Sequence, residues 1–181
     1  MPLDLTLPSH APELGAWDNY NTDDASFALY TLIPSSRAQL QKIADRLEKK
    51  WMQESDHDNT HMVRVPPNAE FAGRTLRDIL EAHIALDKEI TPPQEGQAAD
   101  GDIHWYARGF IVLVDEDWED GEGLLFVYAD DDEEDEFRLR NFRFRGREGY
   151  SFLSSLSFGD ITLQEADDNR DDDGVGEEGE D

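Results

Sequence analysis

Hydrophobic residues recur along the chain in blocks whose spacing alternates between that of a strand and that of a helix. Residues 26–33 are apolar at both odd and even positions, which is typical of a strand covered on both faces. Residues 36–53 repeat apolar side chains at helical spacing, with Ser36 and Gln39 as a capping-box signature. The apolar stripe consists of Leu40, Ile43, Ala44, Leu47 and Trp51. Charged residues, Glu48 among them, fill the opposite face, so we expect a strand followed by an amphipathic helix.

A second strand and helix follow the first pair. Residues 60–65 alternate apolar and polar side chains, and Pro66 and Pro67 close the segment, which favours an edge position in a sheet. Thr75 with Asp78 three places on then predicts the start of a second helix.

Two apolar runs of strand length come next, without a helix between them. They occupy residues 110–114 and 124–128, and Asp120-Gly121 between them is a usual turn signal of a hairpin. We therefore expect two antiparallel neighbours in the middle of the sheet.

The segment Phe137–Arg145 predicts a fifth strand. Its apolar positions change from odd to even across Asn141, which is what a β-bulge produces. Further apolar residues predict a last short strand and a short helix capped by Asp160. The strand would contain Leu153, Leu156 and Phe158, and the helix Ile161 and Leu163.

The order β-α-β-α-β-β-β predicts an α+β domain over residues 26–164, with a single mixed β-sheet of five or six strands and two main helices.

Residues 1–25 are expected to form an extended arm in which prolines separate leucines; the arm either docks on the domain or stays free to capture a partner. Residues 165–181 hold ten acids and one base, so we expect a disordered acidic tail. Residues 87–102 form one long polar loop.

Charge narrows the classes of function. The chain of 181 residues carries a net charge of −27, and −18 remains without residues 165–181. Such a charge disfavours binding to nucleic acid. The chain has no cysteine, no signal-peptide pattern and no apolar run long enough to cross a membrane, so we expect an intracellular protein, cytoplasmic or nuclear.

Chemistry-bearing motifs are sparse, and we expect no catalytic residue, no cofactor and no metal. There is no nucleophile elbow and no phosphate-binding glycine loop. His57 and His61, with two aspartates beside His57, are four residues apart, yet a solvated loop explains them better than a metal site. The acids from Asp115 onward resemble a calcium loop, but the glycine falls at position seven instead of six and Phe126 occupies position twelve.

Five of the sixteen bases lie within ten residues of one another, alternating with aromatic side chains. They are Arg138, Arg140, Arg143, Arg145 and Arg147. We consider three interpretations of these arginines. They pair with nearby acids of the same chain, bind an anionic ligand or acidic partner peptide, or bind nucleic acid. Pairing within the chain is favoured. Acids flank the preceding strand in two loops. The candidate acidic interaction surface comprises Asp115, Asp117, Glu119, Asp120, Asp131, Asp132, Glu133 and Glu134.

Three segments are similar to a family of small acidic proteins from bacteria and fungi known only as a domain of unknown function. The segment Phe71–Leu80 resembles that family's Phe-x-Gly-x-Thr entry into a helix. The two apolar strands followed by Phe137-Arg138, and the segment Leu156–Ile161, complete the resemblance. It implies a single α+β domain and assigns no catalytic residue.

The leading hypothesis is a non-catalytic module that binds a basic partner protein through its acidic loops and tail, as inhibitor and immunity proteins do. The rival is a small-ligand binder or enzyme. Its pocket would lie near His83, His104 and Trp105, with an arginine from residues 138–147 holding an anionic group. A third alternative is nucleic-acid mimicry by spaced carboxylates. The sequence does not give the oligomeric state.

Overall fold

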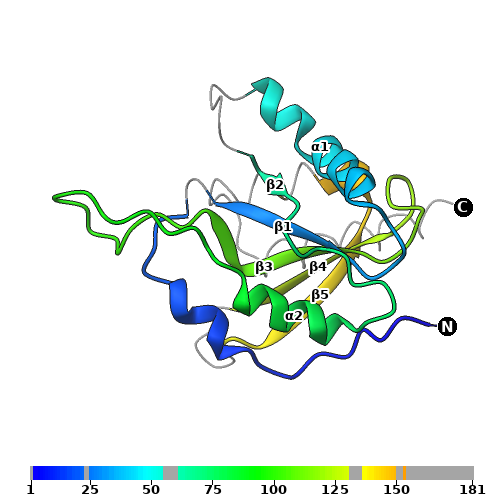
Figure 1. Cartoon of the computed structure of the whole chain (residues 1–181), viewed down its shortest axis with the longest axis horizontal. Helices are drawn as coiled ribbons and strands as arrows, with labels where there is room; N and C mark the ends of the chain where they lie inside the picture. Colours follow the sequence, from blue (N-terminus) through cyan, green and yellow to red (C-terminus); the bar gives the residue numbers. More distant parts are fainter. Residues whose placement is uncertain (1, 23–24, 55–60, 131–135, 150–152, 154–181) are drawn as a thin grey trace, which may run out of the picture.

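The computed structural model describes residues 2–22, 25–54, 61–130, 136–149 and 153. One mixed sheet of five strands runs through this part of the chain, in the order β2-β1-β3-β4-β5 (Figure 1). The strands are β1 (Ser26–Thr31), β2 (Val63–Arg64), β3 (Trp105–Leu113), β4 (Leu124–Ala129) and β5 (Leu139–Phe144). β1 pairs in parallel with β2 and β3, whereas β4 is antiparallel to β3 and β5. The α+β class, the element order and the edge position of β2 are confirmed.

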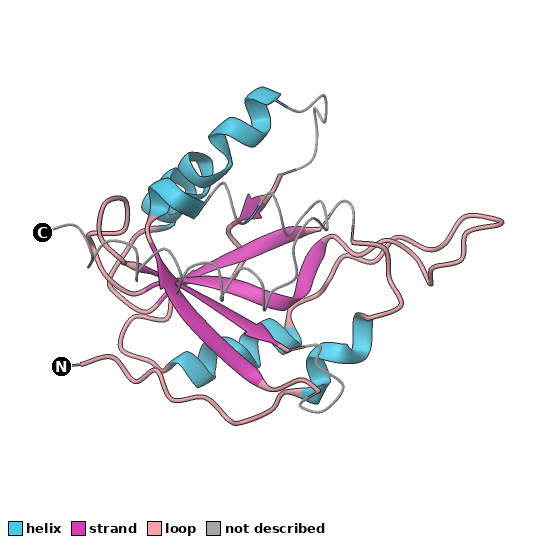
Figure 2. Ribbon diagram, turned by 180° about the vertical axis from the view of Figure 1, so that it is seen from behind, coloured by secondary structure: helices cyan, strands magenta, loops and turns pink. Residues whose placement is uncertain are grey.

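Helices cover both faces of the sheet. α1 (Arg37–Glu54) packs on one face, and α2 (Leu76–Ala85) lies on the other together with η1 (Pro12–Trp17), as both ribbon views show (Figures 1 and 2). The crossover from β1 to β2 and the crossover from β2 to β3 run in opposite directions across the sheet. Because such crossovers are right-handed, their helices fall on opposite faces. This explains why β1 is buried along its whole length.

The helices begin where the sequence predicts them. Before α1, the Ser36 Oγ accepts from the Gln39 N–H (3.2 Å) and the Gln39 side chain accepts from the Ser36 N–H (3.1 Å). Before α2, Thr75 and Asp78 form the same reciprocal pair. The α1 stripe from Leu40 to Leu47 is buried, which confirms its inward face. In the part of the chain that the structure describes, no helix is long and apolar enough to cross a membrane.

Aromatic side chains fill the core on both sides of the sheet. Phe126 of β4 lies between Phe27 of β1 (ring centroids 5.8 Å apart) and Phe142 of β5 (5.6 Å). On the α2 side, Tyr30 packs edge-on against Phe110 of β3 (5.6 Å). Gly109 of β3 leaves room for the Phe126 ring, because a Cβ there would lie 2.9 Å from it.

The predicted β-bulge in β5 is wrong. The register with β4 is regular throughout, and Asn141 pairs with Val127 without an extra residue. The odd apolar positions that suggested a bulge are Phe137 and Leu139. Phe137 precedes the strand with a positive φ of 64° and is therefore not aligned by the pleat, and Leu139, the first residue of the strand, is only half-buried. An irregular register occurs instead between β1 and β3, near Ser26.

The C-terminal predictions fare differently. Residues 146–149 are helical, and so is Leu153, which is fully buried; the expected strand at Leu153 is therefore wrong. A Cβ on Gly149 would lie 2.7 Å from Leu47, so this helical turn packs against α1. The predictions for residues 156–163 and for the tail 165–181 lie outside the described residues.

The N-terminal arm is docked on the domain. Ala11 and Leu14 are buried, and three leucines of the arm pack partly buried against the core: Leu3, Leu5 and Leu7. Backbone hydrogen bonds fix its path, with the Ser9 carbonyl accepting from the Leu139 N–H (2.9 Å) and the Asp4 carbonyl from the Leu76 N–H (3.0 Å). The prolines exclude an α-helix as expected, but Pro12 opens the short 3₁₀ helix η1.

Candidate interaction surfaces

The acidic loop between β3 and β4 is a compact turn held by its own backbone. The Gly123 carbonyl accepts from the N–H groups of Val114 (2.9 Å) and Asp115 (3.2 Å). Asp115 Oδ1 accepts from the Asp117 N–H (2.9 Å), and Asp117 Oδ1 accepts from the Gly121 N–H (3.1 Å). These bonds present the carboxylates in a defined arrangement on a connection between two buried strands.

Within the described part of the chain, basic side chains pair with only one half of this loop. Arg46 of α1 pairs with Glu119 (3.3 Å), and Arg147 pairs with Asp120 (3.7 Å). Both pairs are solvent-exposed, and exposed pairs of this kind contribute only about 0–1 kcal/mol. The exposed run Asp115–Asp117 has no ion pair with any residue that the structure describes. The loop therefore has one half whose carboxylates pair with cations and one half whose carboxylates have no cation partner among the described residues.

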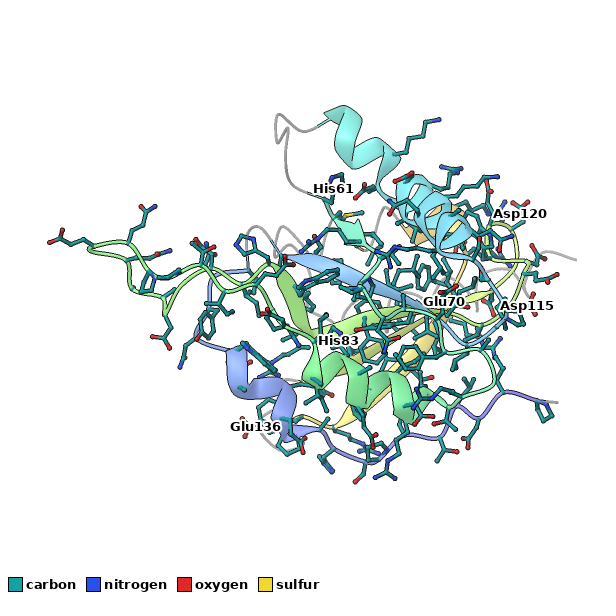
Figure 3. All side chains as sticks on the ribbon, in the orientation of Figure 1. His61, Glu70, His83, Asp115, Asp120 and Glu136 are labelled. Atoms are coloured by element: carbon teal, nitrogen blue, oxygen red, sulfur yellow. The ribbon has the colours of Figure 1, made fainter. Side chains whose placement is uncertain are left out.

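The second predicted acidic group follows β4 in the sequence. Asp131, Asp132, Glu133 and Glu134 lie outside the described residues. The nearest described residues on either side are Asp130, which is buried, and Glu136, which is exposed. Figure 3 shows Glu136 far from Asp115 and Asp120, and six strand residues separate the two ends by roughly 20 Å. Among the described acids, Asp115 and Asp120 therefore lie at one end of β4, and Asp130 and Glu136 at the other.

Three of the five clustered arginines have carboxylate partners among the residues that the structure describes. Arg140 Nε lies 2.8 Å from the buried carboxylate of Asp130, Arg145 pairs with Glu148 (3.7 Å), and Arg147 pairs with Asp120. This arrangement agrees with the internal pairing favoured by the sequence. Arg138 is exposed where its backbone bridges to His10. Arg143 is exposed and makes no side-chain hydrogen bond or ion pair with the described residues.

Of the three residues expected to line the rival pocket, His83 is enclosed by protein groups. His83 is completely buried on α2 and receives a hydrogen bond from Tyr30, whose Oη lies 2.9 Å from its Nδ1. Its Nε2 lies 3.0 Å from the Tyr106 carbonyl and 3.1 Å from the Ala107 carbonyl. Because carbonyl oxygens only accept, Nε2 carries the proton and Nδ1 accepts from Tyr30. Burial, and secondarily the Lys88 ammonium, lower the pKa of His83 to about 3, so its ring is neutral at physiological pH.

The cation beside Trp105 comes from the predicted strand at residues 60–65 and is not one of the arginines from residues 138–147 that the rival hypothesis named. Arg64 of β2 stacks over the Trp105 ring at 4.0 Å and donates to the His104 carbonyl (2.6 Å). The arginines of β5 lie two strands away from β3, across β4. A cation–aromatic pair across a parallel sheet has no signature in local sequence, because Arg64 and Trp105 are far apart along the chain.

Two buried charged side chains also escaped the sequence analysis. Glu48, expected on the solvent face of α1, is buried and accepts from the Val63 N–H (3.1 Å), with His61 Nδ1 at 2.8 Å. Of the predicted histidine pair, His57 lies outside the described residues. Within the described ranges, no three metal-ligating side chains cluster. The Glu48 carboxylate, beside the exposed His61, instead connects α1 to the start of β2 through the Val63 N–H.

The second buried charge is Lys88, which is 2% exposed at the end of α2. Its ammonium donates to the carbonyls of His83 (2.6 Å) and Leu86 (2.8 Å) and lies 4.3 Å from the Trp17 ring. Burial lowers the pKa of Lys88 to about 8, although neighbouring Asp87 opposes the shift. The lysine caps the helix and joins it to the arm. Beyond it, the predicted polar loop projects from the body on a stem that pairs Thr91 with Asp102 (Figure 1).

No family model, curated protein or solved structure matches the chain, so its function has to be argued from its own residues.

Proposed function

We propose that this protein is a non-catalytic interaction module that binds a basic partner protein through the acidic loop between β3 and β4. The observation that carries the proposal is the exposed run Asp115–Asp117, which keeps its charge without a described cation partner on a loop fixed by internal hydrogen bonds. Because these hydrogen bonds already fix the backbone of the loop, binding has little backbone freedom left to remove, and the loss of conformational entropy that opposes association is small.

The charge of the whole chain supports the same proposal. A net charge of −27 attracts a basic protein over distances beyond direct contact and speeds the encounter. The same field repels nucleic acid, which is therefore not the expected partner. The arginines that could hold an anionic substrate are largely engaged, with Arg140 on the buried Asp130 and Arg147 on Asp120. A catalytic role has no comparable support, because His83 is enclosed by Tyr30 and two carbonyl groups.

The test is affinity capture by the tagged full-length chain at low and high salt. One variant neutralises the loop: Asp115→Asn, Glu116→Gln and Asp117→Asn. We expect the wild-type chain to capture a defined basic protein at low salt and to release it at high salt, because exposed charges are screened. The loop variant should capture markedly less of that protein.

A matched control separates the loop from net charge. The substitutions Glu13→Gln, Glu95→Gln and Asp100→Asn remove the same charge from exposed residues on the arm and the projecting loop. This variant should capture as much as the wild type. Equal loss in both variants would show that only total charge matters, and no salt-sensitive basic protein captured by the wild type would contradict the proposed function.

A further inference from the structure

The outer edge of β5 carries backbone groups that no described strand covers. β5 is the last strand of the sheet, and its inner side pairs with β4 from Leu139 to Phe144. The Asp130 N–H donates to the Arg138 carbonyl toward β4, whereas the Leu139 N–H donates outward to Ser9. Inward and outward groups alternate in an antiparallel ladder. The N–H and C=O groups of Asn141 and Arg143 therefore point outward, away from β4.

The arm shows that this edge accepts an extended segment. Residues Ser9–Ala11 form an antiparallel bridge with it: the Ala11 N–H donates to the Phe137 carbonyl (2.9 Å), and the Leu139 N–H donates to Ser9. Earlier arm residues leave the edge, since the Asp4 carbonyl accepts from Leu76 of α2. The arm thus occupies the edge near residues 137–139 and leaves residues 141–143 without a paired strand among the described residues.

We propose that the open edge of β5 from Asn141 to Arg143 is a second docking site, where an extended acidic peptide of a partner protein adds as a β-strand. Main-chain hydrogen bonds to residues 141 and 143 would hold the peptide, as in other cases of strand addition. The Arg143 side chain, exposed and without an ion pair in the described part of the chain, would pair with a carboxylate of the peptide.

Charge decides which occupant fits this edge. The charge beside the open edge is that of the exposed Arg143, which an acidic peptide can pair with at short range. A second copy paired in antiparallel fashion about residue 143 would instead place two arginines opposite each other. The acidic residues 165–181 of the same chain are rich in aspartate and contain three glycines, which are poor strand formers. The edge therefore favours a peptide that alternates acidic with β-branched residues. This site is separate from the acidic loop of the proposed function.

The experiment measures the binding of a fluorescent peptide of about nine residues, in which glutamate alternates with valine and threonine, by anisotropy. The key variant is Asn141→Pro, which removes an outward N–H that the inner ladder does not use. We expect Asn141→Pro and Arg143→Glu each to weaken binding by about tenfold. Asn141→Thr, which keeps the N–H, should bind as the wild type does.

Three further controls make the result specific. Arg77→Glu makes the same charge reversal at an exposed position on α2 and should leave binding unchanged. A peptide with alternate N-methylated amides should not bind, and this comparison holds even if Asn141→Pro fails to fold. The loop variant at residues 115–117 should still bind the peptide, which separates this site from the proposed function.

Several results would overturn the proposal. The proposal would be wrong if the wild-type chain did not bind the acidic peptide, or if it bound a lysine-containing peptide equally well. It would also be wrong if Arg143→Glu bound the acidic peptide with the affinity of the wild type. Concentration-dependent dimerisation that Asn141→Pro abolishes would identify a second copy as the occupant instead. Slower amide exchange at Asn141 and Arg143 on adding the acidic peptide would support strand addition directly.

Discussion

Replacing His83 by glutamine should make the stability of the protein less sensitive to acid. The neutral His83 ring receives the Tyr30 O–H and donates to the carbonyls of Tyr106 and Ala107 inside the domain. A glutamine amide can also accept and donate, so the variant keeps the polar character of the site but has no titratable ring. The substitution therefore isolates the protonation of one buried side chain.

The magnitude follows from the pKa in the two states. An unfolded histidine has a pKa near 6.5, whereas burial holds the pKa of His83 at about 3 in the folded protein. As pH falls below about 6.5, the unfolded chain binds a proton that the folded chain does not bind. The stability contributed by neutral His83 is thus complete above that pH and is lost progressively down to about pH 3. Between pH 7 and pH 5 the loss is about 2 kcal/mol.

Urea unfolding followed by tryptophan fluorescence at pH 7, 6 and 5 measures this effect. The wild type and His83→Gln share all 43 acidic residues, so the repulsion that acid relieves cancels in the comparison. We expect the difference in free energy of unfolding between the two proteins to shrink by about 2 kcal/mol from pH 7 to pH 5. A difference that stays constant over this range would refute the assignment of His83 as a buried neutral ring.

Three other substitutions test a buried hydrogen bond, a packed core position and a buried ion pair. Tyr30→Phe leaves His83 Nδ1 without its donor and should lower the free energy of unfolding by about 1–3 kcal/mol in urea titrations. Leu47→Ala empties a fully buried position of α1, and thermal or urea unfolding should show a loss of about 2–5 kcal/mol. Arg140→Met leaves the buried Asp130 carboxylate without this cation and should lower the free energy of unfolding by about 1–3 kcal/mol. The double variant Arg140→Met with Asp130→Asn should lose less, and an equal loss in the two variants would contradict the pairing.

The sequence predicted elements whose signals are local. The capping pair Thr75 and Asp78 is reproduced because it involves residues three apart on one helix. The edge position of β2 followed from the prolines after it. The bulge in β5 was wrong because the odd apolar positions were Phe137, which lies in a turn before the strand, and Leu139, which is the half-buried first residue of the strand.

The environment of the charged residues could not be predicted in the same way. Glu48 lies on the charged face of α1, which the sequence predicts to be exposed to solvent. In the structure its carboxylate is buried and accepts a hydrogen bond from the Val63 N–H of β2. Arg64 stacks on Trp105 only because two strands far apart in the chain are brought together around β1. Such partners depend on strand order, which hydrophobic spacing does not encode.

The central claim is that Asp115–Asp117 form the surface that captures a basic partner. Its most direct test is the association rate of the captured, purified partner, measured by stopped flow from about 20 mM to 500 mM salt. The rate for the wild type should fall steeply with salt, and the loop variant should start about tenfold lower and converge with it at high salt. The control at Glu13, Glu95 and Asp100 should follow the wild type; a loop variant that does the same would contradict the claim.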